Sequence, residues 1–328
     1  MWALPPFLAR GLARNGIAAD LKDWHKVVMT ALTDINSAPA RLRRSVLSVP
    51  AGNARALEKV HGLDCDAVIF DLEDSVAPEK KIEARDNLRR LFREEPLRNR
   101  ETIIRINPLE TEFGRADMDL VVEISPEVVL VPKVERVSEV QAIADILSET
   151  GAPDELAIWA MIETPKGVLN AAAIAGADER LRCFVVGLND LRKGTGVLSQ
   201  PGRAYLVPWL MQVVLAGRAY GIDVIDSVFN DFKDAEAFDA ECTQGRAMGF
   251  SGKMLIHPAQ IEPANRHFGP DPRAVEEAEA VIAAFARPEA QHLNVINLNG
   301  KMVERLHLAE AEKLVASNRI IAERKKLS

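Results

Sequence analysis

Residues 157–171 read AIWAMIETPKGVLNA. In this stretch an apolar run ends at Glu163, and a Thr-Pro pair follows directly. A short apolar run closed by a proline indicates a buried strand that enters a loop. A carboxylate at the end of a buried strand is unfavourable unless a partner stabilises it, so Glu163 is a candidate functional residue. Residues 183–190, CFVVGLND, repeat the design, because an apolar run is followed by a glycine and then by Asp190.

Short apolar segments alternate with segments of helical spacing on both sides of this stretch. Strands are predicted at residues 45–49, 66–71, 102–107, 128–131, 157–162, 182–186, 223–228 and 253–256. Helical segments are predicted at residues 54–61, 80–92, 138–150, 171–177, 206–217 and 234–248.

Fully apolar strands of this kind are typical of a parallel α/β sheet covered on both faces. Eight units in roughly 215 residues favour a (β/α)₈ TIM barrel, whose typical size is about 250 residues. A doubly wound open sheet is the alternative, although the Gly-rich phosphate loop that usually marks it is missing. We therefore expect an N-terminal extension at residues 1–40, a catalytic TIM barrel at residues 41–285, and a linker with a C-terminal helical lid segment at residues 286–328.

Composition narrows the class of partner and the compartment. The net charge is −7 and no basic face stands out, so nucleic acid is not expected as a partner. No apolar run approaches the roughly 18 residues that would span a membrane. The 3 cysteines are far apart and odd in number, which indicates buried thiols in a reducing compartment, here the cytoplasm. Residues 1–19 lack acids and carry arginines, so a mitochondrial transit peptide, and with it the mitochondrial matrix, is the alternative.

Active sites of TIM barrels lie at the C-terminal ends of the strands. The polar candidates that flank the predicted strands are Arg44, Glu73, Asp74, Arg105, Asn107, Lys133, Glu163, Asp190, His257 and Pro258. Solvated loops are polar as well, so a single position of this kind indicates little. The concentration of acids and arginines directly beside apolar runs is the stronger signal.

Glu163 and Asp190 are the candidates for metal ligands. Mg²⁺ prefers oxygen ligands and typically binds one or two carboxylates together with water or substrate oxygens. Such a metal can polarise the carbonyl group of a 2-oxo acid. The alternative is that Glu163 caps a helix and Asp190 caps a turn. Arg105 can bind a carboxylate in fork geometry or stabilise an oxyanion, and its alternative role is an ion pair with Glu73 or Asp74.

Motifs along the chain resemble those of one known family, in the same order. They are RSVLSVPAGN, AVIFDLEDSVAPEKKIEAR, IRIN, LVPKVE, MIETPKGVLNA, VGLNDL, GFSGKMLIHPAQI and NGKMVE. They are similar to motifs of the citrate lyase beta-subunit and malyl-coenzyme A lyase family of aldolases. The resemblance implies a TIM barrel, Mg²⁺ as cofactor, a coenzyme A thioester and a small 2-oxo acid as ligands, and a homotrimer or a dimer of trimers.

The resemblance also implies roles for single residues. Glu163 and Asp190 match Mg²⁺ ligands, and Arg105 matches the arginine that binds the oxo acid. The acids that match the lining of the metal's water shell, and are expected to be catalytic, are Glu73 and Asp74. The residues that match or are expected as substrate or coenzyme A contacts are Arg44, Lys133, His257 and Pro258.

The family reaction is the reversible cleavage of a carbon–carbon bond in a malyl-, methylmalyl- or citramalyl-coenzyme A, through an enolate, to an acyl-coenzyme A and a 2-oxo acid. The C-terminal segment departs from the family pattern GKMIDRPH, because it reads GKMVERLH. Glu304 thus replaces the aspartate that acts as acid/base in a neighbouring subunit's site. A displacement of about 1 Å can lower the rate roughly 100-fold. The alternatives are therefore a malyl-coenzyme A thioesterase, a 2-oxo-acid aldolase without coenzyme A, and a non-catalytic barrel subunit.

Overall fold

The computed structural model describes residues 41–327, so the N-terminal extension and the transit peptide considered for residues 1–40 lie outside the described residues. The described chain divides into two compact units, one spanning Arg43–His267 and one that begins at Phe268. Among residues 41–327, no helix combines the length and the apolar character needed to cross a membrane.

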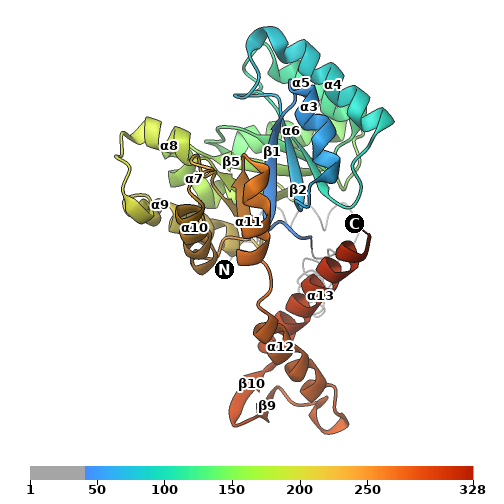
Figure 1. Cartoon of the computed structure of the whole chain (residues 1–328), viewed down its shortest axis with the longest axis vertical. Helices are drawn as coiled ribbons and strands as arrows, with labels where there is room; N and C mark the ends of the chain where they lie inside the picture. Colours follow the sequence, from blue (N-terminus) through green and yellow to red (C-terminus); the bar gives the residue numbers. More distant parts are fainter. Residues whose placement is uncertain (1–40, 328) are drawn as a thin grey trace, which may run out of the picture. The chain divides into compact units, whose positions relative to one another are not determined.

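The first unit is a closed barrel of eight parallel strands (Figure 1). The strands are β1 (Ser45–Pro50), β2 (Ala67–Asp71), β3 (Glu101–Arg105), β4 (Val128–Val131), β5 (Ala157–Ile162), β6 (Leu181–Val186), β7 (Asp223–Asp226) and β8 (Gly252–Leu255). Each strand pairs with the next along the chain, and β1 pairs with β8 to close the ring. The TIM-barrel fold expected from the sequence is thereby confirmed.

Helices surround the barrel (Figure 1). They are α3 (Ala54–Lys59), α4 (Lys81–Glu94), α5 (Gly114–Ile124), α6 (Val137–Glu149), α7 (Pro165–Ala175), α8 (Leu188–Thr195), α9 (Val207–Ala219), α10 (Ala235–Met248) and α11 (Ile261–His267). Short 3₁₀ turns are η1 (Val60–Gly62), η2 (Pro78–Lys80), η3 (Pro201–Arg203) and η4 (Pro258–Gln260). The sequence did not predict α5, α8 and α11, and the predicted start of α7, residue 171, is too late.

The early start of α7 has a local cause. The Thr164 side chain accepts a hydrogen bond from the Gly167 N–H over 3.0 Å, and Pro165 occupies the first helical position. A threonine cap followed by proline is a helix-start signal. Thr164 therefore caps this helix, and Glu163 does not.

The inside of the barrel is filled by one apolar cluster to which every strand contributes. Its members are Val46, Ala67, Ile69, Ile103, Val128, Leu130, Trp159, Met161, Cys183, Val185, Ile225 and Met254. Within a strand they stand at alternate positions, so they mark the inward face of the closed sheet. The same alternation, continued toward the carboxyl ends of β2, β3 and β5, reaches Asp71, Arg105 and Glu163.

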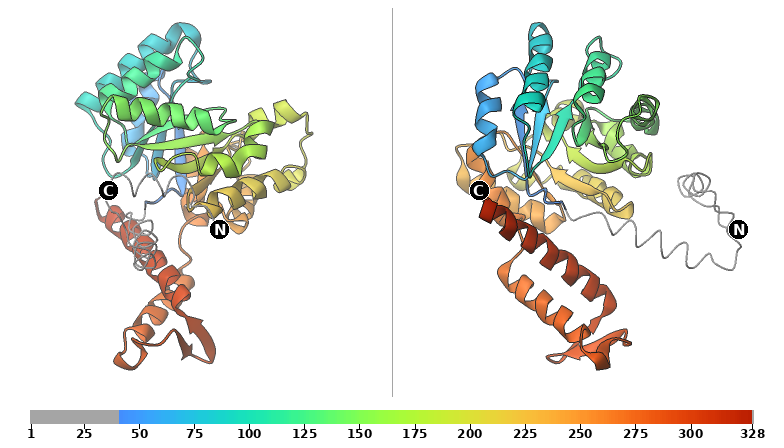
Figure 2. Two further views of the ribbon diagram at one scale, coloured as in Figure 1. Left: turned by 180° about the vertical axis from the view of Figure 1, so that it is seen from behind. Right: turned by 90° about the vertical axis from the view of Figure 1, so that its right-hand side faces the viewer.

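The second unit consists of two helices and a hairpin. Figure 2 shows α12 (Pro272–Phe285) and α13 (Arg305–Leu327) side by side. Between them in the chain lie the turn η5 (Pro288–Ala290) and the antiparallel strands β9 (Val295–Leu298) and β10 (Lys301–Glu304). Buried alanines and valines of the two helices form a small core of their own. Because α12 packs on α13, the units divide before α12 and not at residue 285, where the sequence suggested a boundary.

Candidate active site

Arg105 is held at the barrel mouth by a two-pronged ion pair with Asp71 of the neighbouring strand. Its Nε and Nη2 atoms donate to the two carboxylate oxygens over 2.6 Å each, the fork geometry of a strong charge-assisted contact. Burial alone would raise the pKa of the Asp71 carboxyl, but the Arg105 guanidinium holds that pKa below its ordinary value. The remaining nitrogen, Nη1, lies 3.2 Å from Glu73 Oε2 and 3.5 Å from the Met161 sulfur.

Of the two partners that the sequence suggested for Arg105, the structure brings only Glu73 to it. Asp74 lies instead 3.5 Å from the Lys133 ammonium. Asp71 pairs with Arg105 in the register of β2 and β3 and shares its inward face, which explains why it is the bidentate partner.

Asp71 also shapes the loop that carries Glu73. Its two carboxylate oxygens accept hydrogen bonds from the backbone N–H groups of Glu73, over 2.8 Å, and Ser75, over 3.0 Å. Aspartate side chains typically stabilise turns in this way, by accepting hydrogen bonds from backbone N–H groups that follow in the sequence. The loop after β2 is therefore fixed by the same carboxylate that fixes Arg105.

Lys81 is a site residue that the sequence analysis missed. Its ammonium donates to the backbone carbonyls of Leu72 and Glu73, over 2.6 Å each, and to Asn107 Oδ1 over 2.9 Å. Burial lowers the pKa of this lysine. The signal that could have revealed it is helical spacing, because Lys81 stands on the same buried stripe of α4 as its inward-facing alanine and leucines.

Glu73 lies between Arg105 and Lys133 and is almost completely buried. Its Oε1 accepts a 2.5 Å hydrogen bond from the Lys133 ammonium, whereas its Oε2 accepts none from residues 41–327, although Arg105 is near. Burial raises the pKa of Glu73 above its ordinary value, even though Arg105 and Lys133 oppose the shift. A buried carboxylate with one oxygen unbonded is suited to bind or move a proton.

Glu163 is 3% exposed and held from two sides. Its Oε1 accepts a hydrogen bond from the Lys133 backbone N–H over 2.9 Å. Its Oε2 faces Gly187, where a Cβ atom would lie only 2.3 Å away. Burial, with the negative charges of Glu73 and Asp190, raises the pKa of Glu163 to about 8. An acid opposed by burial and by two neighbouring acids is stabilised as a carboxylate when a cation binds.

Asp190 belongs to the first turn of α8 and is half-buried. Gly187 is the cap residue of this helix, so Asp190 does not cap it. Within residues 41–327 no three acids, histidines or cysteines are grouped as a metal cluster. The charge of Asp190 contributes to the raised pKa of Glu163, so these two carboxylates are the candidate all-oxygen donors. Such a set fits Mg²⁺, which needs few protein ligands, better than the softer transition metals.

A cavity of about 590 Å³ opens beside this cluster. Glu73, Lys133 and Lys81 line it, together with Asn107 and Phe113 of the β3–α5 segment. Its size is typical of a small-molecule pocket. Lys133 is thus in the place expected for a substrate contact, although its ammonium is paired with Glu73.

The structure does not bring Arg44 to this site. Arg44 precedes β1, so it lies at the amino end of the barrel, opposite the mouth. Its Nε and Nη2 atoms donate to the Asp66 carboxylate over 2.7 and 2.8 Å, and Asp66 precedes β2 at the same end. The structure thus places Arg44 in a buried ion pair away from the mouth, and its role as a substrate contact stays a prediction.

His257 and Pro258 follow β8 at the mouth, but on the side of β7. His257 caps the turn η4, with its Nδ1 accepting from the Ala259 N–H, and its ring stacks on Phe232 with centroids 4.4 Å apart. Pro258 begins that turn. Glu304 ends β10 in the second unit, so its action in a neighbouring site stays a prediction.

Comparisons with known proteins agree with the barrel fold. A (3S)-malyl-CoA thioesterase of Cereibacter sphaeroides is 45% identical over 279 residues, which are 85% of this chain and 95% of that protein. The citrate lyase subunit beta of Escherichia coli is 34% identical over 83% of this chain and 94% of its own length. The protein CitE from Mycobacterium tuberculosis, solved in complex with magnesium, acetoacetate and coenzyme A, has a TM-score of 0.65 and 26% identity, over 86% of this chain and all of that one.

The profile of one family covers most of the barrel. It is the family described as HpcH/HpaI aldolase/citrate lyase, and it matches residues 44–258, from the start of β1 to the start of η4. This range contains Arg105, Glu163 and Asp190, to which the resemblance assigned the binding of the oxo acid and of Mg²⁺. The chain belongs to the HpcH/HpaI aldolase/citrate lyase family.

Proposed function

We propose that the protein is a Mg²⁺-dependent enzyme that hydrolyses a malyl-coenzyme A-type thioester to the free hydroxy acid and coenzyme A. The observation that carries the proposal is the 45% identity to a malyl-CoA thioesterase over 95% of that protein's length. The magnesium and coenzyme A in the complex of CitE support the cofactor and the substrate class. Hydrolysis, which the sequence offered as an alternative, is therefore the leading candidate, and carbon–carbon cleavage is the second.

Glu163 and Asp190 would hold the Mg²⁺ ion, which when bound polarises a substrate carbonyl. Arg105 supplies positive charge through Nη1, the nitrogen that Asp71 leaves available for charge developing on oxygen. Glu73 is the proposed base, because its Oε2 is buried beside Arg105 without a hydrogen bond. In hydrolysis, the water oxygen bonds to the thioester carbon, the carbon–sulfur bond breaks, and the sulfur leaves as the coenzyme A thiol after it receives a proton.

Carbon–carbon cleavage is the second candidate, because citrate lyase beta subunits are also relatives. In that reaction a base removes the hydroxyl proton, the hydroxyl-bearing carbon becomes the carbonyl of the 2-oxo acid, and its bond to the thioester's α-carbon breaks. The electron pair remains on the α-carbon as an enolate, which an acid then protonates. Glu304 is the expected acid, contributed by a neighbouring copy in a homotrimer or a dimer of trimers. Hydrolysis requires no such residue, which agrees with the departure from the family pattern at Glu304.

Product analysis separates these candidates. Purified protein, malyl-coenzyme A and Mg²⁺ should yield malate and free coenzyme A, measured with a thiol reagent and by mass spectrometry. Glyoxylate and acetyl-coenzyme A, in place of malate, would establish the lyase. The Glu163→Gln variant, which keeps the shape of the side chain, is the control and should lose both activities. Turnover of free 2-oxo acids alone would indicate the aldolase, and no turnover of any of these compounds would indicate a non-catalytic barrel.

A further inference from the structure

Lys133 has a backbone conformation that is rare for its residue type. It follows β4 with a φ of 52°, in the left-handed region. In that region the Cβ atom of an ordinary residue crowds the backbone carbonyl, so long side chains avoid it. Residues held in this way cluster at functional sites, where the surrounding structure fixes them.

The neighbouring backbone shows how the conformation is fixed. The next residue, Val134, donates its N–H to the Met161 carbonyl at the end of β5 over 3.2 Å. Its own carbonyl is packed so closely on the first turn of α7 that a Cβ atom at Gly167 would lie 2.5 Å away. The segment after β4 is therefore held between the strand and the helix that flank Glu163.

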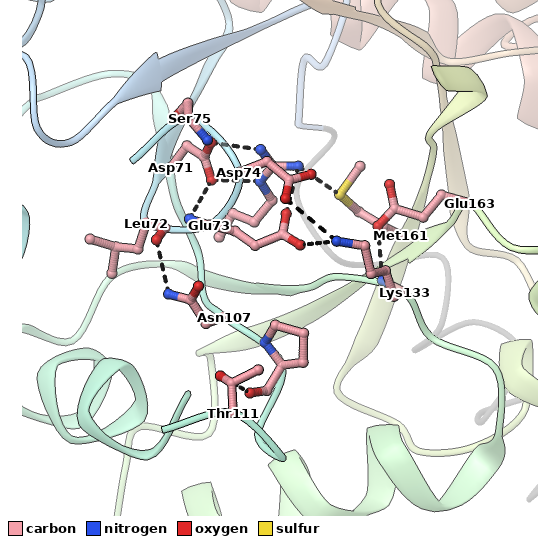
Figure 3. A network of polar contacts seen from close by, with 12 residues as sticks. Asp71, Leu72, Glu73, Asp74, Ser75, Asn107, Thr111, Lys133, Met161 and Glu163 are labelled. Atoms are coloured by element: carbon pink, nitrogen blue, oxygen red, sulfur yellow. Dashed lines mark hydrogen bonds and ion pairs between the residues drawn. The ribbon is translucent and has the colours of Figure 1, made fainter. Parts of the chain in front are cut away.

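Lys133 contacts two acids that follow different strands. The backbone N–H donates to Glu163 Oε1 over 2.9 Å, and the ammonium donates to Glu73 Oε1 over 2.5 Å (Figure 3). The first acid is the proposed metal ligand after β5, and the second is the proposed base after β2. Lys133, which follows β4, thus contacts both acids.

We propose that Lys133 is a positioning residue with two separable roles, which rests on the proposed Mg²⁺-dependent function. Its left-handed backbone aims the N–H at Glu163 and so orients the metal ligand. Its side chain holds Glu73 beside Arg105 and so orients the base. Neither hydrogen bond requires that Lys133 also binds the substrate directly, as the sequence led us to expect.

The backbone role is tested by a pair of variants that both lack the ammonium. Lys133→Gly permits a positive φ freely, whereas Lys133→Val opposes it, because a β-branched residue is an outlier there. Calorimetric titration with Mg²⁺ alone should give a Kd within twofold of the unmodified protein for the glycine variant. The valine variant should bind at least tenfold more weakly. Equal affinities for the two variants would overturn the backbone role.

Thermal unfolding provides a second measurement that does not depend on the valine variant folding. Lys133→Gly should unfold at a higher temperature than Lys133→Ala, since only glycine relieves the crowding at positive φ. Alanine is ordinarily the more stable of the two, because it has less freedom in the unfolded chain. An alanine variant that is the more stable would therefore also overturn the backbone role.

The side-chain role is tested by changing the head group and keeping the length. Lys133→Met should lower kcat/KM for the thioester at least tenfold while the Mg²⁺ affinity stays within twofold. Lys133→Arg, which keeps a cation near Glu73, should recover most of that loss. Unchanged kcat/KM in the methionine variant, or a matching loss of Mg²⁺ affinity, would overturn it. Absence of Mg²⁺ binding by the unmodified protein would refute the proposed function as well. If every Lys133 variant binds Mg²⁺ with the affinity of the unmodified protein, only the backbone role of Lys133 is refuted.

Discussion

Replacing Gly187 by alanine should weaken Mg²⁺ binding, because the new methyl group occupies space that Glu163 needs. A Cβ atom at Gly187 would lie 2.3 Å from Glu163 Oε2 and 2.6 Å from Glu163 Cβ. Ordinary van der Waals contact begins near 3.4 Å, so the carboxylate would have to retreat by about 1.1 Å. Glu163 has little room for that movement, since it is 3% exposed and its Oε1 is bonded to the Lys133 N–H.

The size of the effect follows from the displacement. Overpacking at a buried position costs about 1–3 kcal/mol, and each 1.4 kcal/mol changes an equilibrium constant about tenfold. If the strain falls on the bound state, the Kd for Mg²⁺ should rise about 5- to 100-fold. A reacting group misplaced by about 1 Å lowers the rate roughly 100-fold, so kcat/KM should fall at least as much. Calorimetry and steady-state kinetics on the same preparation measure both quantities.

Gly62→Ala is the matched control for this substitution. Gly62 ends η1, and a Cβ atom there would meet no heavy atom within 4 Å. The Mg²⁺ affinity and the kcat/KM of the Gly62→Ala variant should equal those of the unmodified protein. A folded Gly187→Ala variant with a Kd within twofold of the control would show that Gly187 does not set the position of the metal ligand.

Three further outcomes are expected. Arg105→Lys keeps the charge but loses the two-pronged contact with Asp71, so kcat/KM should fall about 100-fold or more at nearly constant Mg²⁺ affinity, as kinetics and calorimetry would show. Arg44→Met breaks a buried ion pair, so urea unfolding should show a loss of about 3–5 kcal/mol; a loss of kcat/KM in the folded variant without this destabilisation would instead support a substrate contact. Burial raises the pKa of the Asp226 carboxyl, but Lys253 and Arg203 outweigh it and lower that pKa in the folded chain. The folded chain then binds fewer protons than the unfolded one, and the stabilisation present above the unfolded pKa of about 3.9 is lost as the pH falls through the lower folded value. Urea unfolding should show this loss between roughly pH 5 and 3, and an equal loss in Asp226→Asn would contradict it.

The barrel could be predicted from sequence because each strand is a short apolar run, and an apolar run is a local property. Asp71, Arg105 and Glu163 could also be grouped from sequence, since they share the inward alternation of the core. The placement of Arg44 was wrong for a reason that the sequence itself contains. Arg44 precedes the first strand, and residues that precede a strand lie at the end of the barrel opposite the active site.

The left-handed backbone conformation of Lys133 could not have been predicted, because nothing in the local sequence favours it. Its conformation is set by Met161 on the next strand and by Gly167 in the next helix, so it is a consequence of tertiary packing. Its ammonium contacts Glu73 in the loop after β2, and the two residues are 60 positions apart in the sequence. A sequence motif identifies a lysine at this position. Only the folded barrel shows that its backbone N–H binds Glu163 and its ammonium binds Glu73. A variant series at Lys133 that separates metal affinity from turnover is therefore a more direct test of this site than removal of either acid.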